Sequence, residues 1–175
     1  RQVDMRDELA QLFYESAAIG VQGGELNVEL TMLLKRPGWL RTLSSYITRE
    51  IDEYAIDSLS STSDTLPYAT MCASDLGFPI QWVRQNKITE GTNDVRRTIL
   101  LTSITPQEEE INSFAQLFSS AKIELVGIYS LLGIKEPNTS IRLLNLIPLK
   151  DVLSIYQRLY LIEPEVYETL MSKLA

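Results

Sequence analysis

The stretch from Leu149 to Ile162 constrains this chain most, because its apolar side chains recur at helical spacing. The members of this apolar stripe are Leu149, Val152, Leu153, Tyr156, Leu159 and Tyr160. Lys150, Asp151, Ser154 and Gln157 are left for the opposite face, so the stretch predicts an amphipathic helix. Pro148 fits its first turn, and Glu163-Pro164 ends it and begins a second amphipathic helix. Both helices need an apolar partner, which we expect the earlier chain to supply.

The rest of the sequence is also interpreted mainly as helix. The expected helices span residues 3–19, 25–35, 39–59, 67–76, 95–100, 106–118, 122–132 and 141–146. The strongest local signal is Thr105-Pro106-Gln107-Glu108, which matches a capping box with Thr105 at the N-cap and Glu108 at N3. The fold class predicted from this pattern is all-α, with seven to nine helices and room for two helical lobes.

Two regions are expected, residues 1–104 and 105–175. The first contains an irregular segment at 77–94, within which 78–83 alternates like an extended strand. It also contains residues 58–65, a run rich in Ser, Thr and Asp that predicts a mobile linker. We see no internal repeat.

Composition excludes several functions. The chain has no histidine and one cysteine, which excludes Ser-His-Asp triads, Cys-His dyads and zinc sites built on imidazole. No glycine-rich phosphate-binding motif occurs. We therefore predict no catalytic, cofactor-binding or metal-binding residues and a protein that is not an enzyme. Cys72, among small and apolar neighbours, is interpreted as a buried packing thiol.

Charge and length bear on partners and location. The net charge of −7 and pI near 4.7 disfavour nucleic acid and anionic membranes as partners. No apolar run reaches the roughly 18 residues that a membrane span needs. The first residue is Arg1, which indicates a processed or excised segment. We expect an intracellular, cytoplasmic protein, since folding does not depend on a disulfide.

The leading functional hypothesis is a helical interaction or assembly module that binds a protein partner or self-associates. It would be part of a larger protein, such as a viral or phage structural protein. The candidate partner-binding residues lie near the C-terminus and are Leu153, Tyr156, Tyr160 and Tyr167. Tyrosine rings suit such a surface because they combine an apolar body with a polar tip.

A second hypothesis is a helical domain that binds nucleic acid through basic residues beside a tryptophan. Lys35, Arg36 and Arg41 surround Trp39 in the sequence. Arg84, Lys87, Arg96 and Arg97 follow Trp82.

A third hypothesis comes from the segment that contains Pro79-Ile80-Gln81, Arg84 and Glu90-Gly91-Thr92-Asn93-Asp94. It resembles the E-G-T-N-D/E segment near the C-terminus of acyl-CoA dehydrogenases. The resemblance implies a degenerate helical domain of that family, with this segment beside a flavin and an acyl chain. It also implies that Glu90 corresponds to the catalytic base.

Overall fold

The computed structural model describes residues 4–89 and 94–175, and the chain divides into two compact units. Unit 1 comprises Arg1–Leu40 and Ile147–Ala175, and unit 2 comprises Arg41–Leu146. The boundary expected between residues 104 and 105 lies inside unit 2. Among the described residues, no helix is long and apolar enough to cross a membrane.

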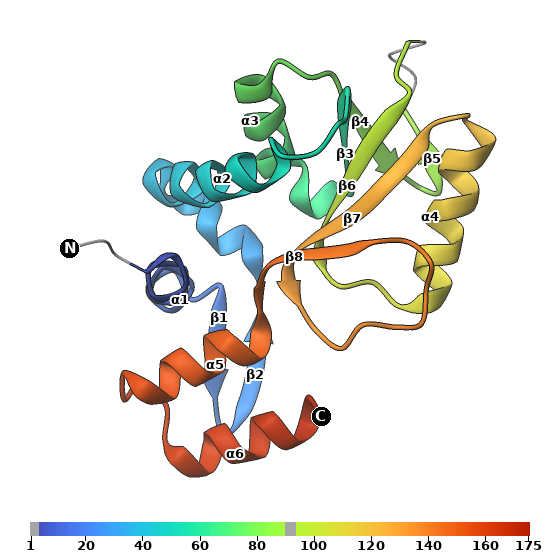
Figure 1. Cartoon of the computed structure of the whole chain (residues 1–175). Coiled ribbons are helices and arrows are strands. Elements are labelled where there is room, and N and C mark those ends of the chain that lie inside the picture. The colour runs from blue at the N-terminus through green and yellow to red at the C-terminus, as the bar shows by residue number, and fades with distance from the viewer. Residues whose placement is uncertain (1–3, 90–93) are drawn as a thin grey trace. The chain divides into compact units, whose positions relative to one another are not determined.

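Unit 1 is built around two helices far apart in the sequence. Its elements are α1 (Met5–Glu15), β1 (Ile19–Gln22), β2 (Glu25–Val28), the 3-10 helix η1 (Leu30–Lys35), α5 (Leu149–Arg158) and α6 (Pro164–Lys173). β1 and β2 form an antiparallel hairpin. Helix α5 packs against α1 and α6 (Figure 1).

The C-terminal apolar stripe is buried in unit 1 over most of its length. Leu149, Val152, Leu153 and Tyr156 are all at most 3% exposed. The Tyr156 hydroxyl donates to the carbonyl oxygen of Ile19 at 2.8 Å, which satisfies its one buried polar group. This confirms the prediction that the earlier chain covers the stripe.

The stripe is shorter than predicted, because α5 ends at Arg158. Tyr160 follows with a positive φ of 58° and is 93% exposed.

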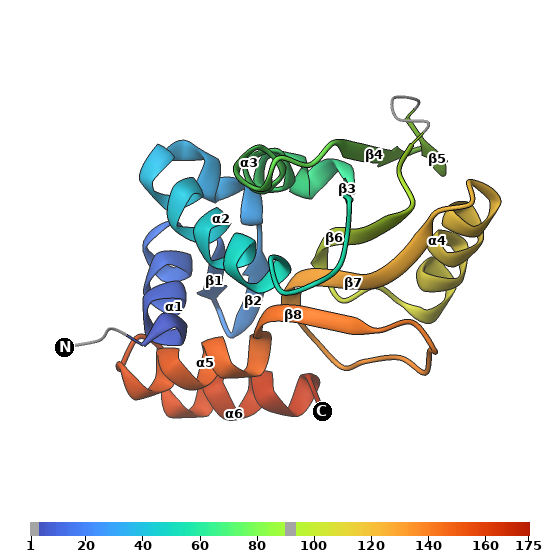
Figure 2. The same cartoon turned by 45° about the horizontal axis from the view of Figure 1, so that its top comes forward.

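Unit 2 contains a six-stranded sheet in the order β5-β4-β3-β6-β7-β8 (Figures 1 and 2). The strands are β3 (Ser58–Ser61), β4 (Ile80–Arg84), β5 (Lys87–Ile88), β6 (Arg97–Ile104), β7 (Glu124–Gly133) and β8 (Leu143–Pro148), the last of which runs into unit 1. β4, β3, β6 and β7 are parallel, and β5 pairs antiparallel with β4.

Helices cover both faces of this sheet. They are α2 (Pro37–Ile51), which begins in unit 1, the 3-10 helix η2 (Ser63–Thr65), α3 (Leu66–Leu76) and α4 (Glu108–Ser120). Ile111 and Phe118 of α4 pack on Val83, Leu100 and Ile128 of the sheet. Side chains alternate along a strand, so Tyr129 points to the opposite face, where its hydroxyl donates to Glu50 of α2 at 2.6 Å.

The all-α prediction is wrong, and its errors in the central strands have one physical cause. Strands at the centre of a parallel sheet are covered on both faces, so their apolar residues form runs instead of alternating. Such runs cannot be distinguished from a buried helix by periodicity. Residues 95–100 and 122–132, expected as helices, belong largely to β6 and β7. The helix expected at 25–35 is also wrong but for another reason, since this segment forms η1 and the hairpin strand β2, whose residues alternate between exposed and half-buried.

The segment at 58–65 is also corrected. It was expected to be a linker, but it contains β3 and η2, and all four residues of β3 are buried. β3 pairs with β4 on one side and β6 on the other. Its buried serines are tolerated because they bond to groups on the neighbouring strands: the Ser60 hydroxyl donates to Gln81 Oε1 of β4 at 2.7 Å and lies 2.7 Å from the Thr98 hydroxyl oxygen of β6.

Candidate functional site

The order of the strands singles out one edge of the sheet in unit 2. From β3 the chain continues through α3 to β4 on one side, whereas β6 and β7 lie on the other side. The sheet therefore reverses its direction of growth between β3 and β6. In open α/β sheets, ligands bind at such a switch point, beyond the carboxyl ends of the strands.

A depression of about 410 Å³ lies at this point, and we call it the switch-point pocket. Its lining comprises Thr62 and Asp64 after β3, residues 102–107 from β6 and its turn, Glu110 and Phe114 of α4, and Ile134 after β7. All of these residues belong to unit 2.

Asp64 is the central polar group of the pocket. Its Oδ1 accepts a hydrogen bond from the Thr62 hydroxyl at 2.6 Å, and its Oδ2 accepts one from the Ser103 hydroxyl at 2.6 Å. These two bonds tie the turn after β3 to the end of β6. They hold the Asp64 carboxylate between two hydroxyls at the carboxyl edge of the sheet.

Other hydroxyls in the pocket support the backbone. Thr102 lies 2.9 Å from the Ser130 hydroxyl oxygen and links β6 to β7. Thr105 accepts from the backbone amide of Ile134 at 3.1 Å. Thr105 is therefore not the N-cap of α4, contrary to the sequence prediction. Gln107 takes that position, and the capping box pairs it with Glu110, two residues later than expected.

Two cations lie at the carboxyl end of the neighbouring strand β4. The guanidinium of Arg84 lies over the Trp82 ring, 4.3 Å from its centre, and the Trp82 ring N–H donates to the Ser63 hydroxyl at 3.0 Å. Ser63 adjoins Asp64, so Arg84 is linked to the rim of the pocket. Lys87 follows on β5, and both side chains are exposed.

The basic residues grouped by sequence around Trp82 are separated by the fold. Arg96 and Arg97 stand at the start of β6, the edge opposite to the one that ends in Arg84, because β4 and β6 both run parallel to β3. Arg97 is paired with Glu124 at 2.8 Å. Around the other tryptophan, Lys35, Arg36 and Arg41 are exposed, with Arg36 4.7 Å from the centre of the Trp39 ring.

The predicted partner-binding residues differ in how far their side chains are buried. Leu153 and Tyr156 are 0% and 1% exposed, so their side chains serve the core of unit 1. Tyr160 is exposed and Tyr167 is half-buried. A role for these two tyrosines in binding a partner stays a prediction. Glu90 and residues 91–93 of the acyl-CoA dehydrogenase-like segment lie outside the described residues.

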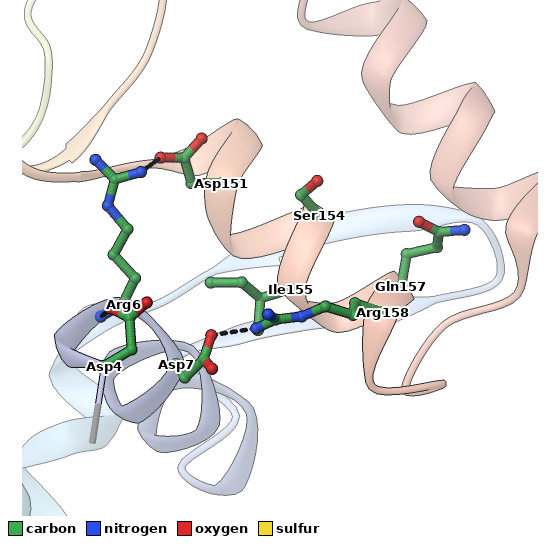
Figure 3. Close-up of a pocket in the computed structure, with 8 residues that line it drawn as sticks. All are labelled: Asp4, Arg6, Asp7, Asp151, Ser154, Ile155, Gln157 and Arg158. Carbon is green, nitrogen blue, oxygen red and sulfur yellow. Dashed lines mark hydrogen bonds and ion pairs between the residues drawn. The ribbon is translucent and has the colours of Figure 1, made fainter. Parts of the chain in front are cut away.

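Unit 1 holds a second depression, of about 380 Å³, between α1 and α5 (Figure 3). Arg6 Nη1 pairs with Asp151 Oδ2 at 2.6 Å, and Arg158 pairs with Asp7. Each helix thus supplies one cation and one anion, and the charges neutralise one another across the groove. This arrangement joins two helices and leaves the switch-point pocket as the better ligand site.

Neither depression offers a reactive thiol or a metal cage. Cys72 is buried, and burial raises the pKa of its thiol to about 11, which suits the predicted packing role. Among the described residues, no cluster of three or more metal-ligating side chains occurs.

Comparison with protein-family models finds no match, and comparison with curated proteins finds none either. Solved structures do match. UMP synthase of Leishmania donovani has a TM-score of 0.84 at 16% identity, over 96% of this chain and 42% of that chain. This chain therefore spans less than half of that protein.

Other phosphoribosyltransferases match over most of their length. Orotate phosphoribosyltransferase from Aeropyrum pernix has a TM-score of 0.69 at 18% identity, over 87% of this chain and 99% of that one. Adenine phosphoribosyltransferase from Trypanosoma brucei, in complex with AMP, pyrophosphate and ribose-5-phosphate, has a TM-score of 0.65 at 11% identity, over 86% and 82%. The chain has the α/β phosphoribosyltransferase fold.

These matches correct the sequence-based hypotheses. An all-helical assembly module, a viral or phage structural protein, a helical nucleic-acid-binding domain and a helical acyl-CoA dehydrogenase remnant all presuppose an all-α fold. The matched structures are instead α/β enzymes, so the expectation of a non-enzymatic protein is contradicted as well.

The residues of the switch-point pocket were missed. The one signal in the sequence that could have located the pocket was the Ser/Thr/Asp run at 58–65. Such a run is typical of a linker, but also of a turn that follows a strand and binds a ligand.

Proposed function

We propose that this chain is a transferase that binds a phosphorylated ribose at the switch-point pocket and moves its phosphoribosyl group. The observation that carries the proposal is the position of the pocket. It lies at the switch point beyond the carboxyl ends of the strands, which is where open α/β sheets bind their ligands. The same fold serves orotate and adenine phosphoribosyltransferases.

The residues at this edge supply two kinds of group. Asp64, with Thr62 and Ser103 bonded to it, offers oxygens to the hydroxyls of a sugar. Arg84 and Lys87 offer positive charge to a phosphate, and arginine binds phosphate through paired N–H groups. A ligand with a sugar at one end and a phosphate at the other matches this arrangement.

The proposed reaction exchanges two bonds at C1 of the ribose. The bond from C1 to a pyrophosphate oxygen breaks, a bond from C1 to a nitrogen of the base forms, and that nitrogen loses its proton to the medium. In the reverse direction, pyrophosphate releases the base from a nucleotide.

The reverse reaction gives the test. The purified chain is incubated with pyrophosphate, magnesium chloride and each of AMP, GMP, UMP, CMP and orotidine monophosphate, and the free base is measured by chromatography. We expect release from one of them. Asp64→Asn and Arg84→Ala should each lower the rate about 10–100-fold, as expected for the loss of a charged hydrogen bond.

Asp75→Asn, an exposed carboxylate on α3 outside the pocket, is the matched control and should keep the full rate. The proposal fails if no nucleotide releases its base and ribose-5-phosphate does not bind.

A further inference from the structure

Helix α2 presents a continuous row of exposed residues to the solvent. Its inner side buries Leu43, Ser44, Ile47 and Ile51. The opposite side carries, at spacings of three and four residues, Gly38, Arg41, Ser45, Arg49 and Asp52. All five are exposed, and we call them the α2 row. Two of its members are small, which lets another helix approach the row closely.

The two arginines of the α2 row have no acidic partner in the described structure. No ion pair between residues that the structure describes includes Arg41 or Arg49. The Arg49 guanidinium lies over the Tyr46 ring, 5.5 Å from its centre. At the start of the helix, Arg36 lies in the same way over Trp39. Arginine beside tyrosine or tryptophan is the composition that is enriched in protein interfaces.

The charges along α2 run in the order opposite to the one that the dipole of the helix favours. A helix is stabilised by acidic residues in its first turn and by basic residues in its last. The first turn of α2 has no acidic residue, and Lys35 and Arg36 precede it. Asp52 and Glu53, both exposed, directly follow the helix. Only Arg49, in the last turn, agrees with the dipole. A second helix that runs in the opposite direction would account for this order.

We propose that the α2 row is the surface through which two copies of this chain associate, with their α2 helices antiparallel about a two-fold axis near Tyr46. In this register Arg41 of one copy faces Asp52 and Glu53 of the other, and Arg49 faces Ser45. The two-fold axis repeats each contact, so the basic start of each helix lies beside the acidic end of the other. No residue of α2 belongs to the described lining of the switch-point pocket, and the proposal does not depend on the proposed function.

Sedimentation velocity of the full chain over a concentration series tests this proposal. We expect a monomer–dimer equilibrium that is about 10-fold or more weaker in about 500 mM than in about 50 mM sodium chloride, because salt screens exposed charges. Arg41→Glu and Asp52→Arg each place like charges opposite one another and should each weaken the dimer about 10-fold or more. The double variant Arg41→Glu/Asp52→Arg should associate more tightly than either single variant. The two positions are roughly 16 Å apart along one helix, so this recovery can arise only between copies.

Arg96→Glu makes the same charge change at an exposed arginine outside α2 and is the matched control, which should leave the dimer unchanged. Circular dichroism checks that each variant is folded. The proposal is overturned by a monomer at the highest concentration in low salt, by a dimer that Arg41→Glu does not weaken, or by a double variant no tighter than the single ones. The wild type decides the question even if a variant folds poorly, since a dimer that salt does not weaken would contradict a contact between these charges.

Discussion

Glu50 shows how burial changes the behaviour of a single residue. Its carboxylate accepts the Tyr129 hydroxyl at 2.6 Å behind the sheet. Burial raises the pKa of Glu50 from its ordinary value of 4.5, the hydrogen bond from Tyr129 lowers it in part, and Glu53 raises it. Burial and the neighbouring carboxylate raise the pKa of Tyr129 as well, so the phenol stays protonated and donates.

This pair predicts a pH dependence of stability. Folded Glu50 keeps its proton to higher pH than it does in the unfolded chain, so the free energy of unfolding should fall as pH rises from 4.5 through the folded pKa. Glu50→Gln should remove this decline. Tyr129→Phe, which deletes the bond that lowers the pKa, should extend it to higher pH. Urea denaturation between pH 4 and 8 measures these slopes, and equal slopes in Glu50→Gln and wild type would contradict the prediction.

At the scale of elements, amphipathic helices could be predicted from the sequence and buried strands could not. Helix α5 shows one apolar stripe and polar residues opposite, and its predicted start at Leu149 is correct. Strand β7 lies between β6 and β8 with most of its residues buried, so it lacks a polar face that would reveal period-two alternation.

The burial of the α5 side chains predicts which contacts of this helix stabilise unit 1. Leu153 is fully buried, and Leu153→Ala should lower the free energy of unfolding by about 2–5 kcal/mol, since it removes apolar contacts and leaves a cavity. Arg158→Ala removes one exposed ion pair with Asp7 and should cost at most about 1 kcal/mol. Thermal and urea unfolding followed by circular dichroism compares the two. A larger loss from Arg158→Ala would mean that charge, and not burial, joins α5 to α1.

At the scale of the whole molecule, the pairing of β3 decides the fold. This four-residue strand, three of whose residues are serine, joins the two halves of the sheet. Neither its composition nor its length indicates this role. Once β3 lies between β4 and β6, the switch point and its pocket follow from the topology.

Hydrogen exchange on the intact chain tests this placement. Amides of β3 and β6 should exchange among the slowest, because both strands are paired on two sides, whereas those of the two-residue edge strand β5 should exchange at least 10-fold faster. Amides of residues 58–61 that exchange as fast as those of a loop would restore the linker interpretation and contradict the sheet.

The sequence by itself determined the amphipathic helices, the buried thiol and the lack of imidazole chemistry, because these depend on residue type and local spacing. Only the tertiary structure decided that the apolar runs are strands and that Asp64 and Ser103 meet at one pocket. Those features depend on hydrogen bonds and side-chain contacts between residues about forty positions apart in the chain, such as the bond from Ser103 to Asp64. The local sequence pattern does not indicate which distant residues pair, so the site could not be predicted until the fold was known.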